Sequence, residues 1–122
     1  MPFHIVPPGP PIILSDSGKL LLDVTDHVRP ESTAVLVCET VGGDPLPRLS
    51  WWRGKTIVDD VVEEVDAKEY RVRNTLRLPN LKRADHGAEY TCKAINTNLT
   101  GPAKTSIKIN MVCKYDSDVV LF

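Results

Sequence analysis

The chain has 122 residues, 42% of them hydrophobic and 25% charged, which suits one compact domain and is too short for two independent hydrophobic cores. A formal net charge of −1 excludes the basic surplus that recruits nucleic acid. The longest apolar stretches fall far below the roughly 20 residues that cross a bilayer, and the first residues carry no recognisable signal peptide.

The N-terminal segment, residues 1–11, is rich in proline. Proline fixes the backbone dihedral φ and lacks an amide hydrogen, so such density favours extended polyproline II geometry and opposes a helix. We therefore interpret residues 1–11 as a linker that precedes the folded domain.

From residue 12 to residue 110, apolar residues recur largely with a period of two, which is the pattern of half-buried strands. Runs of Gly, Pro, Asn, Asp and Ser interrupt the pattern at short intervals and predict turns. Many short strands in about 100 residues are typical of a β-sandwich or a barrel. The predicted strands are Ile12–Leu14, Leu20–Val24, Ala34–Thr40, Arg48–Arg53, Thr56–Val58, Tyr70–Val72, Asn74–Leu78, Ala88–Ala94 and Ala103–Ile109.

The segment 57–68 is acidic, and its apolar residues return every four positions. This spacing suits a helical face, but nearly all of these apolar residues are β-branched, which weakens helices. We predict an exposed edge strand and loop, whose charge resists pairing with other chains. A calcium site is the alternative, although the segment lacks an Asp-x-Asp-x-Asp-Gly loop.

Cysteine, tryptophan and tyrosine residues occur in a pattern that predicts the fold. Leu36 shares a face of its predicted strand with Cys38, and Tyr90 shares a face with Cys92, so both thiols are expected to point into one core. Trp51 lies between the two cysteines in the sequence. The order Cys, Trp, Tyr-x-Cys is typical of the immunoglobulin fold, an all-β, two-sheet Greek-key β-sandwich.

This fold implies a disulfide between its strands B and F, here Cys38 and Cys92, against which the tryptophan packs. The residues alone also allow free thiols in a cytosolic core. Zinc needs about four ligands, and no Cys-x-x-Cys or histidine pair accompanies the two cysteines. A disulfide indicates an oxidising compartment, and Asn98-Leu99-Thr100 is a sequon that predicts N-glycosylation of Asn98 in a turn.

Residues 7–111 resemble the second immunoglobulin domain of the arthropod Sidestep family. The resemblance rests on the tandem Trp51-Trp52, on Arg73-Asn74-Thr75-Leu76 and on Asn96-Thr97-Asn98-Leu99-Thr100. It implies a core of Leu36, Trp51, Leu76 and Tyr90 around the disulfide.

Sidestep proteins are transmembrane cell-surface ligands of Beaten path receptors in axon guidance. The resemblance therefore implies cell adhesion or recognition, on the extracellular side of the plasma membrane, with a protein partner that a neighbouring domain meets first. The alternatives are a structural spacer and an intracellular muscle-type scaffold domain.

The resemblance divides the chain into the linker 1–11, an immunoglobulin-like domain over 12–111 and a tail over 112–122. The tail does not look like a linker to another domain, and we interpret the chain as a fragment or as an incomplete gene model. Cys113 lies in this tail and is the odd thiol once Cys38 and Cys92 pair.

Strand alternation predicts a possible partner-binding face. If Trp51 points into the core, Ser50 and Trp52 point the other way. Tryptophan is enriched among interface anchors, so Trp52, Thr91 and Lys93 are candidates for a partner face. The alternative is a ring covered by lysine stems of its own sheet. The residues expected on this outward face are Glu89, Thr91, Lys93, Lys104, Ser106 and Lys108.

The sequence contains no arrangement typical of an enzyme. Its three histidines are far apart and fall in the linker and in turns, and no glycine-rich phosphate loop or His-Glu-x-x-His motif occurs. We therefore predict no catalytic residue, no cofactor, no metal site, no small-molecule substrate and no nucleic acid partner.

Asp85 precedes the predicted strand that carries Tyr90. Many sandwich domains pair an aspartate at this place with an arginine, and Arg71 and Arg73 are the candidates. This is a structural expectation, which defines no binding site.

Overall fold

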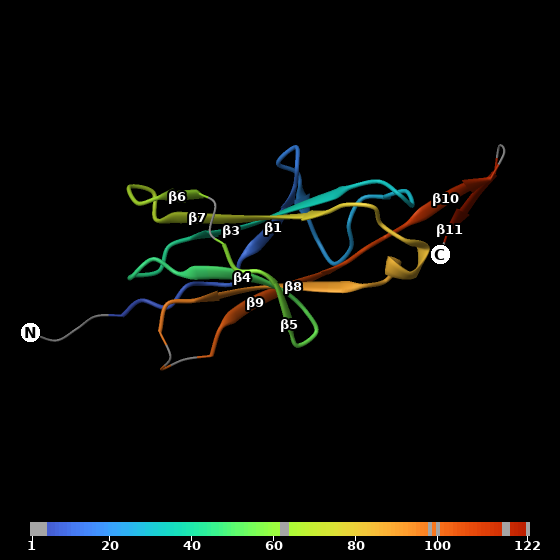
Figure 1. The fold of residues 1–122 in the computed structure, drawn as a ribbon. Coiled ribbons are helices and arrows are strands. Elements are labelled where there is room, and N and C mark those ends of the chain that lie inside the picture. The colour runs from blue at the N-terminus through green and yellow to red at the C-terminus, as the bar shows by residue number, and fades with distance from the viewer. Residues whose placement is uncertain (1–4, 62–63, 98, 100, 116–117, 122) are drawn as a thin grey trace, which may run out of the picture.

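The structure, a computed structural model, describes residues 5–61, 64–97, 99, 101–115 and 118–121. Two antiparallel sheets pack face to face as two layers (Figure 1). The first sheet has the order β2-β1-β3-β7-β6. Its strands are β1 (Ile12–Ser15), β2 (Leu20–Leu21), β3 (Ala34–Val41), β6 (Glu64–Asp66) and β7 (Arg71–Leu78).

The second sheet has the order β5-β4-β8-β9, and the all-β, two-sheet prediction is confirmed. A short 3-10 helix precedes β8, and a two-stranded hairpin lies at the end of the molecule opposite the N-terminal segment (Figure 1). These elements are β4 (Arg48–Arg53), β5 (Thr56–Asp59), η1 (Arg83–Asp85), β8 (Glu89–Ile95), β9 (Ala103–Lys108), β10 (Val112–Tyr115) and β11 (Asp118–Leu121).

Most predicted strands agree with the structure to within one residue at each end, and two predictions differ by more. Tyr70–Val72 and Asn74–Leu78 are not two strands, because Arg71–Leu78 is continuous and points Val72, Asn74 and Leu76 inward. An inward Asn is tolerated here because its Nδ2 donates to the Leu49 carbonyl at 3.1 Å. The second predicted strand ends early, since Asp23 adopts a positive φ of 65° that no strand continues.

The acidic segment 57–68 contributes edge strands to both sheets. β5 lies at the edge of the four-stranded sheet, and β6 lies at the edge of the five-stranded sheet. Most of the described residues of both strands are exposed, as expected for charged edges that resist pairing with another chain.

The core is built around a disulfide between β3 and β8, which are strands B and F of the predicted fold. Cys38 and Cys92 are bonded across 54 positions of sequence, so the predicted B–F disulfide is confirmed. Trp51 is fully buried beside Cys92 in the β4–β8 register. Its indole nitrogen donates to the Asn74 carbonyl of the opposite sheet at 3.0 Å, which ties the two layers together.

Residues 5–11, the described part of the predicted linker, lie against the domain. Val6 and Asp44 exchange two backbone hydrogen bonds of 2.8 Å each. The Asn96 amide donates to the Val6 carbonyl at 2.7 Å and to the Pro45 carbonyl at 2.8 Å. The segment interpreted as a linker is therefore held by the backbone of Asp44 and the side chain of Asn96, a contact that composition alone does not reveal.

Met111, the last residue of the predicted domain, is packed in the core. Met111 is fully buried and forms a bridge with Val28. The described part of the tail 112–122 forms the β10–β11 hairpin. The side chain of Cys113 lies outside the described residues.

Candidate functional site

The outer surface of the four-stranded sheet carries the residues that alternation predicted there. Trp52 pairs with Thr91 in the β4–β8 register, and Thr91 pairs with Ser106 in the β8–β9 register. Buried and outward positions alternate along all three strands. We call this surface the β4-β8-β9 face, and its outward residues are Ser50, Trp52, Glu89, Thr91, Lys93, Lys104, Ser106 and Lys108.

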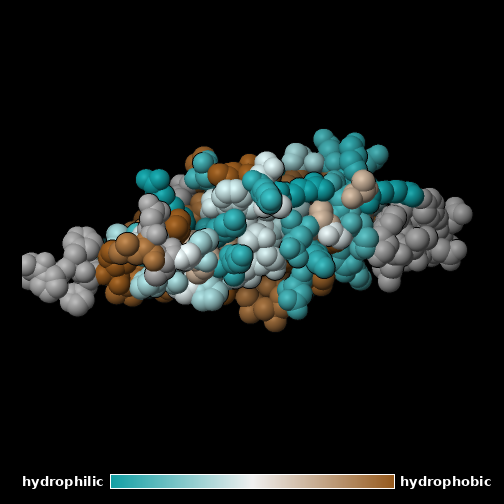
Figure 2. Space-filling model, turned by 90° about the horizontal axis from the view of Figure 1, so that it is seen from below, coloured by the Kyte–Doolittle hydropathy of each residue, from teal (hydrophilic) through white to brown (hydrophobic). Residues whose placement is uncertain are grey.

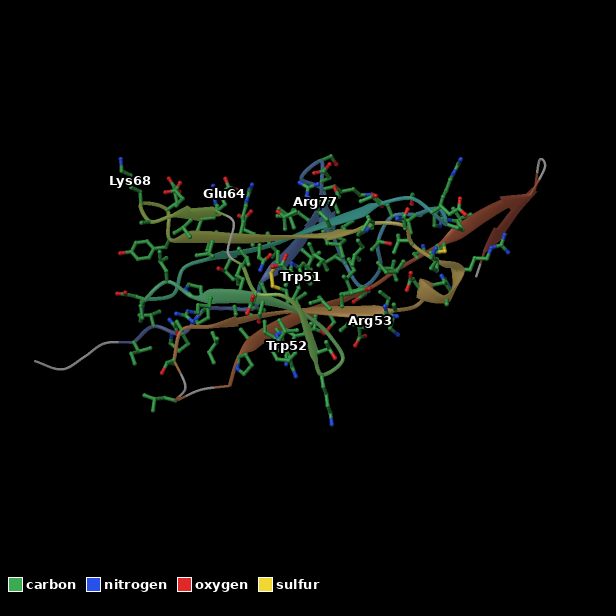
Figure 3. All side chains as sticks on the ribbon, viewed as in Figure 1. Trp51, Trp52, Arg53, Glu64, Lys68 and Arg77 are labelled. Atoms are coloured by element: carbon green, nitrogen blue, oxygen red, sulfur yellow. A yellow bond between two sulfur atoms is a disulfide. The ribbon has the colours of Figure 1, made fainter. Side chains whose placement is uncertain are left out.

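Trp51 and Trp52 point to opposite sides of the sheet. Figure 3 shows Trp51 between the two layers and Trp52 on the outer side of the four-stranded sheet. Trp51 is fully buried, whereas Trp52 is half-buried. Adjacent residues of a strand face opposite ways, so the tandem pair supplies one core ring and one surface ring.

The surface ring is held in a defined orientation. The Trp52 indole nitrogen donates to the Ser50 hydroxyl at 2.8 Å. The Lys93 ammonium lies 4.0 Å from the centroid of the Trp52 ring, where the electron-rich face of the ring attracts a cation. Lys93 therefore covers part of the ring, as the alternative of a lysine-covered ring predicted, and the partner face stays a prediction.

An open hollow of about 700 Å³ lies on this face, and one of its lining residues, Lys93, contacts the Trp52 ring. The Thr91 and Ser106 hydroxyls are hydrogen-bonded at 2.7 Å within it. Figure 2 views the molecule from this side and shows a mainly hydrophilic surface, with hydrophobic residues toward its margins. The hollow is lined by Arg53, Gly54, Glu89, Thr91, Lys93, Lys104 and Ser106.

The aspartate before β8 has a different partner from the one expected. Asp85 lies 3.4 Å from Arg53 of β4, and that guanidinium also reaches the Tyr90 hydroxyl at 3.3 Å. The expectation that Arg71 or Arg73 pairs with Asp85 is therefore wrong. Both of these arginines lie on the outer side of β7, next to β3 and β6, whereas η1 ends beside β8.

Arg71 and Arg73 instead contact a glutamate that sequence reasoning missed. Glu39 of β3 is 7% exposed and accepts from Arg73 at 2.8 Å, with Arg71 at 3.3 Å. Two cations compensate the burial of one carboxylate. A charged residue within an apolar strand is the only sequence signal for this cluster, because its partners come from a strand far along the chain.

The remaining predicted residues lie as follows. Leu36, Leu76 and Tyr90 are buried in the core between the sheets. Asn98, the predicted glycosylation site, lies outside the described residues. Ser50 was expected on the same face as Trp52, but its role as the hydrogen-bond acceptor of the Trp52 indole was missed. Residues two positions apart on a strand lie on the same face, and this spacing is the signal that could have indicated the contact.

The described residues contain no group of three or more His, Cys, Asp or Glu side chains that could hold a metal ion. No helix in that part of the chain combines the length and apolar character needed to cross a membrane.

Comparison with known proteins gives one family and several relatives. A family model described as immunoglobulin domain matches residues 25–105. MAM domain-containing glycosylphosphatidylinositol anchor protein 2 of Rattus norvegicus is 38% identical over 96 residues, covering 78% of this chain and 9% of that protein. Nephrin of Homo sapiens is 27% identical over 122 residues, covering 96% and 9%.

A muscle protein and a solved ectodomain are also similar. M-protein, striated muscle, of Gallus gallus is 26% identical over 98 residues, covering 79% of this chain and 7% of that protein. The full ectodomain of mouse nectin-like molecule 4 superimposes with a TM-score of 0.68 and 19% identity, over 88% of this chain and 36% of that chain. The chain spans 7–9% of the length of these curated relatives.

Proposed function

The chain belongs to the immunoglobulin domain family, and we propose that it serves as a protein-recognition domain on the outer surface of a cell. The observation that carries the proposal is the oriented Trp52 ring on the β4-β8-β9 face. The Cys38–Cys92 disulfide agrees with an oxidising, extracellular compartment. The similarity to a glycosylphosphatidylinositol anchor protein agrees with a membrane-attached parent.

Two properties of the Trp52 ring, its residue type and its fixed orientation, support protein binding by this face. A few anchors, often tryptophan, supply most of the binding energy. A ring already held by Ser50 and Lys93 loses little conformational freedom on binding, which lowers the cost of association. Trp52, Thr91 and Lys93 are therefore the proposed partner-binding residues. Their action is binding through the sheet surface, with no chemical step.

A finer proposal is that the domain is of the Sidestep type and acts in axon guidance. This proposal rests on the resemblance of residues 7–111 to Sidestep domains. In it, residues 12–111 form the domain, residues 1–11 are the linker before it, and residues 112–122 are a tail outside the resemblance. A Beaten path-type receptor is then the proposed partner of the parent protein, with a neighbouring domain meeting it first. Asn98 is proposed to carry a glycan.

Trp52→Ala tests the recognition proposal. We expect the wild-type domain to bind one member of a set of Beaten path-type ectodomains saturably in surface plasmon resonance. Loss of a central anchor is expected to weaken that binding about 30-fold. Arg77→Ala, on the outer side of the other sheet (Figure 3), is the matched control and should leave the affinity unchanged.

Two results would contradict the recognition proposal. Trp52→Ala with unchanged unfolding and unchanged affinity would exclude this face. An absence of saturable binding to every ectodomain would favour the alternative function, a spacer that sets the reach of a neighbouring domain. The docked segment 5–11 is the observation that favours a spacer, because it fixes the direction in which the chain leaves the domain.

The muscle relative makes an intracellular scaffold domain the second alternative. The mass of the domain, secreted from insect-type cells behind an added signal peptide, separates the two compartments. We expect reduction to add about 2 Da, one hydrogen for each sulfur, and glycosidase to remove a glycan that the Asn98→Gln variant lacks. Free thiols and an unmodified Asn98 would instead support the intracellular alternative.

A further inference from the structure

The β4-β8-β9 face carries cations without acidic partners. Among the described residues, no carboxylate lies within 4.0 Å of the Lys93, Lys104 or Lys108 ammonium groups. Glu89 is the one acid on the face, and it lies opposite Lys108 in the β8–β9 register. Lys93 and Lys104 are therefore left as uncompensated positive charges, although the whole chain has a net charge of −1.

The β8–β9 register places these two lysines on opposite, neighbouring positions of the two strands. Lys93 of β8 pairs with Lys104 of β9, and like charges opposite each other in a sheet are destabilising. The cation–π contact with Trp52 offsets part of this repulsion for Lys93 alone. An anion bound between the two ammonium groups would remove the repulsion, so the register itself favours an anionic ligand.

The lining of the hollow suits a polar, anionic ligand. Beside the two lysines it exposes the paired hydroxyls of Thr91 and Ser106, and Arg53 lies at its rim. Lysines and hydroxyls together suit sulfate or carboxylate oxygens. The hollow is open rather than enclosed, which suits a chain that lies across it.

We propose that this hollow binds a sulfated polysaccharide. Sulfate groups would lie between Lys93 and Lys104. Within the Thr91–Ser106 pair one hydroxyl donates to the other, and the remaining hydroxyl would donate to a sulfate or sugar oxygen. The exposed part of the Trp52 ring would contact a sugar ring. Glu89 would set one limit of the site, because its carboxylate repels the anionic chain. This ligand is distinct from the protein partner proposed above, but the two would share Trp52, Thr91 and Lys93, and they are tested with different probes.

A heparin dodecasaccharide is the probe for this site. We expect the wild-type domain to bind it measurably by calorimetry in about 0.05 M NaCl and to lose that binding in about 0.5 M NaCl, where screening shortens the reach of the charges to a few ångströms. Lys93→Gln/Lys104→Gln is expected to weaken binding about 25-fold, since one lysine beside an anionic surface contributes about fivefold.

The matched control removes two positive charges from the other sheet. Lys68 follows β6 and Arg77 lies in β7, and both are exposed on the layer opposite the hollow (Figure 3). Lys68→Gln/Arg77→Gln is expected to leave dodecasaccharide affinity within about twofold, because charges more than a Debye length from the ligand are largely screened. Unfolding curves of both variants should match the wild type.

Three results would overturn the proposal. The wild-type domain could fail to bind the dodecasaccharide at about 0.05 M NaCl. The control variant could lose as much affinity as Lys93→Gln/Lys104→Gln, which would indicate non-specific electrostatic binding to the protein surface as a whole. A polyglutamate peptide of equal charge could bind more tightly than the dodecasaccharide, which would assign the face to an acidic protein surface. None of these results depends on whether Trp52→Ala changes receptor binding.

Discussion

Replacing Cys38 and Cys92 together by alanine is expected to lower the free energy of unfolding by about 4 kcal/mol. The bond closes a loop of 54 residues between the two sheets, so its loss restores conformational freedom mainly to the unfolded chain. Both sulfur positions are fully buried, and alanine leaves a small void there. The measurement is urea denaturation at 25 °C, compared between the oxidised wild type and the double variant.

The size of this effect is large for a domain of this length. Native domains are stable by only about 5–15 kcal/mol, so the double variant is expected to be partly unfolded at physiological temperature. Cys113→Ser is the matched control, because it removes a thiol and keeps the Cys38–Cys92 bond. A loss below about 1 kcal/mol in the double variant would show that loop closure contributes little here.

Trp51→Ala is expected to destabilise the domain by about 4 kcal/mol. The ring is fully buried between the sheets, so truncation leaves a large cavity that the two layers cannot close. It also removes the hydrogen bond from the indole to the Asn74 carbonyl. Circular dichroism during chemical denaturation measures the change. The fluorescence of Trp52 remains as an independent probe of the outer face.

Two further variants separate the contributions at this position. Trp51→Phe keeps most of the apolar volume and loses the indole donor, so a cost of about 1–3 kcal/mol is expected from the unpaired carbonyl and the smaller ring. Trp52→Ala removes a half-buried ring and should cost about 1 kcal/mol or less. Equal costs for Trp51→Ala and Trp52→Ala would contradict the assignment of one ring to the core and one to the surface.

The sequence by itself determined the fold class and the two sides of the four-stranded sheet. Both depend on local rules. Side chains alternate between faces with a period of two, so placing Trp51 in the core also places Trp52, Thr91 and Lys93 outside. The cysteine pattern added the connection between the layers, because the fold that it indicates joins its strands B and F.

Only the tertiary structure decided which charges meet. Asp85 pairs with Arg53, while Arg71 and Arg73 share Glu39. These choices depend on which strands become neighbours and in what register, and no local pattern encodes a register between segments more than 30 positions apart. Lys93 and Lys104 lie much closer together in the sequence and could be assigned to one face from it. Their position opposite each other still required the β8–β9 register.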